Sequence, residues 1–292
     1  MRRSVTDERL SDLAADSRRV AELALSEDGD VDITSELTVA LETRATGVIE
    51  FRQEGVVAGT AYADAVVALC GGSTEWLVDD GASVSCGAHI GSVRGDLAGI
   101  LRAERPLLNI LQRACGIATA TREYARAVAG TKCRILHTRK TAPGLRGLDV
   151  RAVLSGGGEP HRIDLEQAVM IKDNHWSAME REGTDLSTVC QAARSRGVTD
   201  IYVEVETLAQ VKEALKAGAT RLLVDNQSPQ SFGQFVDTAR SIMPDVEIEA
   251  TGGITLENVR EYAVSGADFA SIGALTHSVT SVDLALEVTE IE

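Results

Sequence analysis

The stretch IYVEVETLAQVKEALKAGATRLLVDN (201–226) decides the fold, because it holds one complete strand–helix–strand unit. Residues 201–206 and 221–224 are short apolar runs typical of strands, and helix-forming residues ending in a glycine lie between them. The segment EYAVSGADFASIGA (261–274) repeats the order of helix, small-residue turn and strand. Repeated units of this kind build a parallel sheet or barrel, so the sequence predicts an α/β fold.

Six strands are predicted in this half of the chain, and polar residues follow each of them. The other four predicted strands cover 134–137, 169–172, 246–250 and 269–273. A barrel of parallel strands places its active site at the carboxyl ends of the strands. The polar groups at those ends are His137 to Lys140, Lys172 to His175, Glu204 and Glu206, Asp225 and Asn226, Thr251 to Gly253, and Ser271 to Gly273. The pattern therefore predicts an enzyme.

The first part of the chain has a different pattern of apolar residues and glycines. Residues 7–25 have the apolar spacing of an amphipathic helix, whereas 40–100 read as short strands separated by glycines. Within that region, EWLVDDGASVSCGAHI (75–90) predicts two strands joined at a DDG turn. Residues 100–130 look helical over most of their length, and Pro106 is expected to break or begin a helix there.

Composition narrows the possible function classes. The 292 residues carry a formal net charge of -15, which argues against nucleic acid as a partner. No apolar run approaches the roughly 20 residues of a membrane span, and the first residues do not read as a secretory signal. A cytoplasmic protein without a membrane partner is therefore expected. The five cysteines are scattered and form no CxxC pair, so neither a zinc site nor a disulfide framework is predicted.

HTRKTAPGLR (137–146) is a basic island in this acidic chain. Between residues 134 and 175, seven Lys and Arg residues face five acids. A local positive charge suits a small polyanion bound in a cleft, and a solvated surface is the alternative. The basic groups come from several segments: Arg139, Lys140, His161, Arg162 and Lys172. Because guanidinium groups pair bidentately with carboxylates, this set favours a substrate that has more than one carboxylate.

Two glycine turns, ATGGIT (250–255) and SIGALTHS (271–278), follow consecutive predicted strands. Backbone N–H groups at such turns bind anions, and barrels commonly hold a phosphate after their last strands. His277 could add a further donor to a phosphate site. Ordinary strand-to-helix turns are the alternative interpretation.

Carboxylates at neighbouring strand ends supply the opposite charge. Glu204 and Glu206 share one face of a predicted strand, and Asp225 ends the next strand. These groups could hold ribose hydroxyls, bind Mg2+ through water or stabilise a cationic centre. A buried ion pair with Lys172 is the alternative. No Ser–His–Asp set or nucleophilic cysteine pattern stands out, so no covalent intermediate is expected.

In this order, the motifs resemble the nicotinate-nucleotide pyrophosphorylase (quinolinate phosphoribosyltransferase) family. The resemblance rests on HTRKTAPGLR, SGGGEPHRIDLEQAVMIKDNH, VEVET, LVDN, TGGI and SIGALTHS, and upstream on DVDIT, GVVAG, LVDDGASVSCG and AERPLLNILQRACGIAT. It covers nearly the whole chain, and the combination of motifs is highly specific.

The resemblance implies two domains and one activity. An N-terminal α/β sandwich domain would cover 1–115, which a C-terminal helix at 281–292 could join, and an open, TIM-like α/β barrel would cover 116–280. A homodimer with a shared active site is implied, either alone or as a hexamer of three dimers. The enzyme would transfer the phosphoribosyl group of PRPP to quinolinate with decarboxylation, giving nicotinate mononucleotide, pyrophosphate and CO2.

The resemblance also gives roles to the matching positions of this chain. Catalytic roles fall to Lys140, Lys172, Glu204 and Asp225. Mg2+ would be bound by the pyrophosphate with the help of the carboxylates of Asp173 and Asp225. Arg105 would reach the neighbouring subunit's site, while Arg139, His161 and Arg162 would grip the quinolinate carboxylates. The glycine turns, with Thr251, Gly252, Gly253, Gly273 and His277, would bind the 5'-phosphate region.

The chain departs from the family pattern at three places. His137 stands where the family normally has Asp, TGGI replaces the more usual SGGI, and the early segment SEDGDVDIT (26–34) lacks the usual Leu-Gly. Because His137 lies two residues from Arg139, the change would alter how that guanidinium is oriented. The alternative activity is therefore that of a paralogue acting on another pyridine or aromatic acid, such as a ModD-type or secondary-metabolite relative. A binding protein without catalysis would lack the acids or the phosphate glycines, and both are present.

Overall fold

The computed structural model describes residue 10 and residues 12–292, which divide into two compact units. Unit 1 comprises the chain up to Arg122, Lys140–Gly158 and Ala274–Glu292, and unit 2 comprises Glu123–Arg139 and Glu159–Gly273. Among the helices of the described residues, none is long and apolar enough to cross a membrane.

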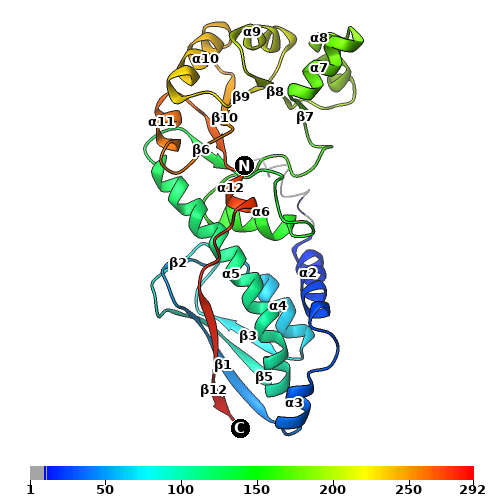
Figure 1. Ribbon diagram of the computed structural model, residues 1–292, viewed down its shortest axis with the longest axis vertical. Helices are drawn as coiled ribbons and strands as arrows, with labels where there is room; N and C mark the ends of the chain where they lie inside the picture. The colour runs from blue at the N-terminus through cyan, green and yellow to red at the C-terminus, as the bar shows by residue number, and fades with distance from the viewer. Residues whose placement is uncertain (1–9, 11) are drawn as a thin grey trace. The chain divides into compact units, whose positions relative to one another are not determined.

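Unit 1 is built on an antiparallel sheet with the strand order β12-β1-β5-β3 (Figure 1). Its strands are β1 (Arg44–Phe51), β3 (Ser73–Trp76), β5 (His89–Asp96) and β12 (Leu284–Ile291), and a second, two-stranded sheet pairs β2 (Gly55–Val56) with β4 (Ser83–Val84). Side chains along β1 alternate between buried and more exposed positions, as expected when one face of a sheet covers a core.

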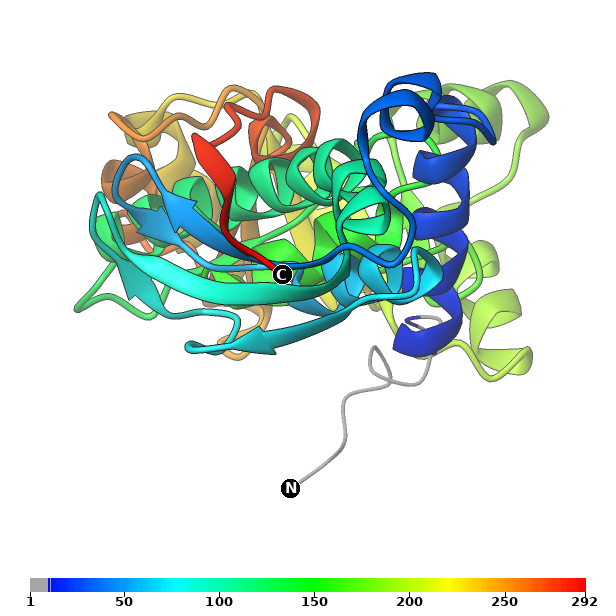
Figure 2. The same ribbon diagram turned by 90° about the horizontal axis from the view of Figure 1, so that it is seen from below.

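The C-terminal residues form a strand, so the expectation of a helix at 281–292 is wrong. Strand β12 runs antiparallel to β1 and places Leu286 opposite Ile49 (Figure 2, red strand). Leu284 and Leu286 are buried while Glu287 is exposed, which is the alternation of a half-buried strand. Pairing with β1 therefore outweighs the helix propensity of the Leu, Ala and Glu residues in this segment.

The helices of unit 1 include one long helix that corrects the expectation for Pro106. They are α2 (Leu13–Glu27), α3 (Ile33–Thr38), α4 (Thr60–Leu69), α5 (Leu97–Ala127, of which the residues from Glu123 on belong to unit 2), α6 (Arg146–Ser155) and α12 (Ala274–His277). Pro106 is buried inside α5 and neither breaks nor begins it. A proline removes one backbone hydrogen bond, and the buried stripe that includes Leu107 and Leu111 keeps both halves in one helix.

Two further expectations for unit 1 differ from the structure. The predicted helix at 7–25 appears as α2, while residues 1–9 and 11 lie outside the described part. The predicted DDG hairpin does not form, because β3 pairs with β5 and β4 pairs with β2. Asp80 of that turn instead accepts hydrogen bonds from the N–H groups of Gly59 and Thr60 (3.0 and 3.3 Å), which ties the turn to the start of α4.

Unit 2 is a six-stranded parallel sheet in the order β6-β11-β10-β9-β8-β7, and all six predicted strands are confirmed. The strands are β6 (Arg134–Leu136), β7 (Val169–Ile171), β8 (Ile201–Val205), β9 (Arg221–Asp225), β10 (Glu247–Thr251) and β11 (Phe269–Ser271). The helices are α7 (Asp173–Glu182), α8 (Leu186–Ser195), α9 (Leu208–Ala217), α10 (Pro229–Ile242) and α11 (Val259–Val264). With β6 and β7 at the two ends of the order, the predicted open α/β barrel is confirmed.

The free side of β6 is covered by an extended segment that begins at Glu159. The N–H of Glu159 donates to the carbonyl of Ile135 (2.7 Å), and Glu159 forms a parallel bridge with Leu136. The segment thus continues the sheet past β6 without a full strand, and it carries His161 and Arg162 along the carboxyl end of β6.

Candidate functional site

The parallel register gathers the predicted polar residues of unit 2 at one end of the sheet. Asp225 lies opposite Thr251 on β9 and β10, and Ser271 lies opposite Leu136 on β11 and β6. Leu136 is followed directly by His137, so groups far apart in sequence share this end of the barrel. This is the end at which barrel enzymes place their catalytic residues.

Glu204 is the most buried of the predicted carboxylates, and it is already paired. Its Oε2 lies 2.8 Å from Nζ of Lys172, and its Oε1 accepts from the N–H of Asp173 (3.4 Å). The ion pair that was an alternative for these residues is therefore present. Lys172 is about half exposed, so its ammonium keeps access to solvent and to a ligand.

Asp225 carries a negative charge that its surroundings do not favour. Burial raises the pKa of Asp225, and the charges of Glu204 and Glu206 raise it further, while Lys172 and the hydrogen bond from Asn226 act in the opposite direction. The amide of Asn226 donates to Oδ2 of Asp225 over 2.6 Å. A cation or a set of hydroxyl donors beside Asp225 would relieve this electrostatic cost.

An acidic cavity of about 600 Å³ opens beside these carboxylates. Its lining includes Asp173, Glu180, Asp185, Glu204, Glu206 and Glu213, together with Trp176. Within the described residues, no group of three or more His, Cys, Asp or Glu side chains is arranged to hold a metal ion. The cavity therefore offers oxygen acceptors for hydroxyls or for a cation that brings other ligands with it.

Two arginines near the end of β6 form the positive part of the site. Burial lowers the pKa of Arg162, and the neighbouring charge of Arg139 lowers it further. The Nη1 of Arg162 donates to the carbonyl of Ala168 (3.2 Å), whereas Nε of Arg139 is buried without a hydrogen-bond partner in the described part of the chain. Two guanidinium groups that repel each other form a natural receptor for an anion.

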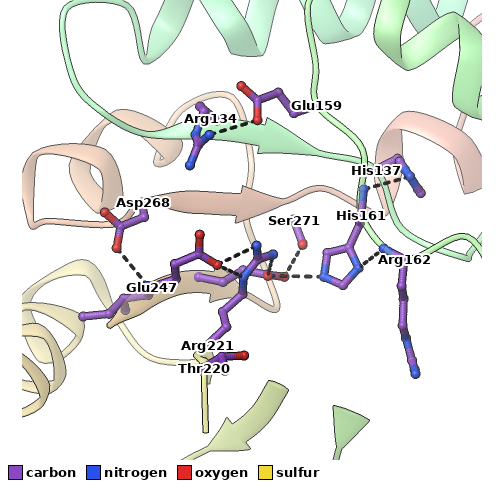
Figure 3. Close-up of polar contacts among 12 residues, drawn as sticks. Arg134, His137, Glu159, His161, Arg162, Thr220, Arg221, Glu247, Asp268 and Ser271 are labelled. Atoms are coloured by element: carbon purple, nitrogen blue, oxygen red, sulfur yellow. Dashed lines mark hydrogen bonds and ion pairs between the residues drawn. The ribbon is translucent and has the colours of Figure 1, made fainter. Parts of the chain in front are cut away.

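A buried network centres on Glu249, which is 1% exposed. Figure 3 labels its members His161, Arg221 and Ser271. The Oε2 of Glu249 lies 3.2 Å from Nε2 of His161 and 3.2 Å from Nη1 of Arg221, and the hydroxyl of Ser271 donates to its Oε1. Burial alone would raise the pKa of Glu249, but His161, Arg221 and Ser271 outweigh burial and lower it to about 2. Glu249 is therefore a fixed anion inside the barrel.

Hydrogen bonds show which ring nitrogens of the two histidines beside this network act as acceptors. The N–H of His161 donates to Nε2 of His137 (3.0 Å), and the N–H of Arg162 donates to Nδ1 of His161 (2.7 Å). A ring nitrogen that accepts carries no proton, so the proton of His161 is on Nε2 and faces Glu249. Both ring nitrogens of His161 are thus engaged by the protein, which favours a positioning role over a direct grip on substrate.

Glu249 and Arg221 were missed by sequence reasoning, although each left a signal. Both are charged residues inside otherwise apolar strands, in VEIEA and RLLV. The guanidinium of Arg221 stacks over the rings of Phe269 (4.0 Å) and Tyr202 (4.6 Å) and also contacts Glu247. An arginine at the first position of a buried strand needs such partners.

The remaining predicted residues are distributed over both units. Thr251 ends β10, and Gly252, Gly253 and Gly273 follow β10 and β11 in unit 2, whereas Arg105, Lys140 and His277 belong to unit 1. Arg105 lies on α5 with 61% of its side chain exposed, and the backbone carbonyl of Lys140 accepts from the hydroxyl of Thr276 (2.9 Å). His277 is exposed at the end of α12.

Comparison with known proteins agrees with the motifs. Residues 32–115 match the family description "Quinolinate phosphoribosyl transferase, N-terminal domain", and residues 117–287 match its C-terminal domain. The chain is 39% identical to the nicotinate-nucleotide pyrophosphorylase [carboxylating] of Mycobacterium leprae, over 96% of this chain and 100% of that protein. It is also 39% identical to the mitochondrial quinolinate phosphoribosyltransferase [decarboxylating] 2 of Nicotiana glauca, over 94% and 82% of the two chains.

Solved structures lead to the same family. The nicotinate-nucleotide pyrophosphorylase from Francisella tularensis aligns with a TM-score of 0.86 and 31% identity, over 94% of this chain and 97% of that one. The corresponding enzyme from Ehrlichia chaffeensis aligns with a TM-score of 0.83 and 30% identity, over 99% and 100%. With two family domains that together span most of the chain, this protein belongs to the quinolinate phosphoribosyl transferase family.

Proposed function

We propose that this chain transfers the phosphoribosyl group of PRPP to quinolinate and that the product loses CO2 to give nicotinate mononucleotide. The arginine pair carries the proposal, since Arg139 and Arg162 repel each other and Nε of Arg139 is buried without a partner in the described residues. A substrate with two carboxylates would neutralise both guanidinium groups. Relatives at 39% identity that are named for this reaction support the proposal.

The chemistry requires positive and negative groups in different places. The pyridine nitrogen attacks the anomeric carbon while the bond to pyrophosphate breaks, so positive charge develops on the ribose ring. Carboxylates such as Glu204 and Asp225 would stabilise that charge and hold the ribose hydroxyls. Breaking the bond to one carboxyl group then releases CO2, and the ring carbon takes up a proton. Cations around the ring would stabilise the electron pair left on that carbon.

The other residues take the roles that the family resemblance implies, with one change. Lys140 and Lys172 serve the pyrophosphate and the reacting region, and the 5'-phosphate is bound by Thr251, Gly252, Gly253, Gly273 and His277. We assign His161 to holding Arg162 in place, because both of its ring nitrogens already have protein partners. Arg105, with its exposed side chain, would complete the site of a second subunit in a homodimer, or in a hexamer of three dimers.

Mg2+ is the proposed cofactor, and the available oxygen ligands fit it. Mg2+ is usually bound by one or two carboxylates together with substrate phosphates and waters. Asp173 and Asp225 would supply the carboxylates, and the raised pKa of Asp225 indicates that a cation there is favourable. The ion would neutralise charge on the pyrophosphate. The cytoplasm is the proposed compartment, which suits the scattered cysteines of the sequence.

The activity is tested with the purified chain, PRPP, Mg2+ and quinolinate. We expect CO2 and nicotinate mononucleotide to form in equal amounts, and EDTA to abolish the reaction. Nicotinate and other pyridine or aromatic acids are assayed in parallel. Turnover of one of these acids without turnover of quinolinate would replace the proposal with the paralogue alternative.

The glycine turn after β10 gives a second prediction. A Cβ on Gly252 would overlap the side chain of Asn226 and lie 2.8 Å from Oδ1 of Asp225, whereas a Cβ on Gly197, in the turn after α8, would meet nothing within 4 Å. Both glycines have positive φ (77° and 80°), so the backbone strain of an alanine is similar at the two positions. We expect Gly252→Ala to raise the KM for PRPP by about 10-fold or more, because Asp225 is displaced.

Gly197→Ala, at a glycine to which no part of the site is assigned, is the matched control for that variant. It should lower the melting temperature about as much as Gly252→Ala but raise the KM for PRPP by no more than about 3-fold. Equal KM values for the two variants would show that Asp225 is not the group affected.

A further inference from the structure

His137 directly follows β6, and it is completely buried. The covering segment pairs with β6 through its backbone at Glu159, whose N–H donates to the carbonyl of Ile135 (2.7 Å). Pro160 has no N–H to donate. At the next position the backbone pairing changes, because the N–H of His161 donates to the side chain of His137 at Nε2 (3.0 Å). The imidazole therefore takes the place of a main-chain acceptor.

A continuous chain of hydrogen bonds leads from His137 to Arg162. His161 is held at its backbone N–H by His137, and its Nε2 donates to Oε2 of Glu249 (3.2 Å). With the ring fixed at both points, its Nδ1 accepts the N–H of Arg162 (2.7 Å). Glu249 is itself held by Arg221 and Ser271, so the far end of the chain has two further polar contacts (Figure 3). The position of the Arg162 backbone is thereby tied to the ring of His137.

We propose that His137 is a positioning residue that sets the place of Arg162 through the His161 ring, and so tunes the affinity for the dicarboxylate substrate. This inference rests on the proposed function, in which Arg162 binds a substrate carboxylate. The family resemblance expects Asp at position 137, which would accept a hydrogen bond but also bring a negative charge into this segment. The Nε2 of an imidazole accepts without that charge, so the charges of Arg139 and Arg162 stay available to the substrate.

Gln and Met at position 137 form a matched pair of variants. The side-chain oxygen of Gln reaches about as far as Nε2 of His and can accept the N–H of His161, whereas Met has a similar length and no comparable acceptor. We expect His137→Met to raise the KM for quinolinate by about 10-fold or more and the KM for PRPP by less than about 3-fold. His137→Gln should keep the KM for quinolinate within about 3-fold of wild type.

A spectroscopic measurement tests the same chain of hydrogen bonds without any substrate. The full chain contains five histidines, so labelling with 15N-histidine gives a small set of ring signals that the variants assign. In wild type and His137→Gln, His161 should show the pattern of a ring with its proton on Nε2. In His137→Met, that signal should shift or broaden, because the N–H of His161 has lost its acceptor.

The outcomes separate this inference from the proposed function. Unchanged quinolinate KM and an unchanged His161 signal in His137→Met would overturn the positioning role. If His137→Met does not fold, His137→Gln decides, because a large rise in its quinolinate KM would also overturn that role. A wild type that shows the expected His161 signal but does not turn over quinolinate would remove the proposed function and still support the hydrogen-bond chain.

Discussion

Arg139→Ala is expected to lower kcat/KM for quinolinate by about 100- to 1000-fold without lowering the stability of the fold. A bidentate, charge-assisted contact with a carboxylate contributes roughly 3–4 kcal/mol, and each 1.4 kcal/mol corresponds to a factor of ten. Removing Arg139 breaks no hydrogen bond of its Nε within the described residues. It also removes the charge that lowers the pKa of Arg162. The melting temperature should therefore stay the same or rise.

A lowered kcat/KM together with an unchanged or raised melting temperature distinguishes a binding residue from a structural one. Arg139→Lys keeps the charge but loses the planar fork, so it should recover only part of the lost kcat/KM. Arg196→Ala, which removes an exposed arginine in the same unit, is the control and should leave kcat/KM unchanged. A quinolinate KM that is unaffected by Arg139→Ala would rule out Arg139 as part of the dicarboxylate site.

The barrel strands could be predicted because each is a short apolar run that ends in polar residues. Runs such as IYVEV and RLLVD leave little choice of structure when helices separate them. The C-terminal strand could not be predicted in the same way. Its Leu, Ala and Glu residues also suit a helix, and only pairing with β1, some 240 residues earlier, decides between the two. The position of Pro106 inside a continuous helix likewise depends on the tertiary packing of α5, which the local sequence does not show.

The site could be predicted as a set of residues but not as a set of contacts. Arg139, Glu204 and Asp225 lie at or just after the carboxyl ends of strands, and parallel strands bring these ends together. In contrast, the role of Glu249 depends on Arg221, which lies 28 residues away, and on His161, which lies 88 residues away. Sequence spacing does not show which ring nitrogen of His161 accepts and which donates. Those details come from the three-dimensional hydrogen bonds alone.

Arg221→Met is expected to lower the free energy of unfolding by about 3–5 kcal/mol, because it leaves the carboxylate of Glu249 buried without its cation. Arg134→Met is a closely matched control. Arg134 and Arg221 each begin a strand, and each guanidinium lies over the ring of Phe269, at 4.2 and 4.0 Å. The ion pair of Arg134 with Glu159 is nearly half exposed, however, so its loss should cost less than about 1 kcal/mol. Urea unfolding at pH 7 gives both values.

The pH dependence of this difference tests the cause. The pKa of Glu249 in the folded chain is about 2, below the ordinary value of 4.5 for a glutamate, so its stabilising contacts act fully above about pH 4.5 and are lost as the pH falls toward 2. Without Arg221, burial has less opposition and the folded pKa of Glu249 rises. The loss of unfolding free energy in Arg221→Met, relative to wild type, should therefore shrink as the pH falls below 4.5. The corresponding loss in Arg134→Met should change little. A deficit of Arg221→Met that stays constant with pH would assign the loss to packing against Phe269 and Tyr202 instead of to the buried charge.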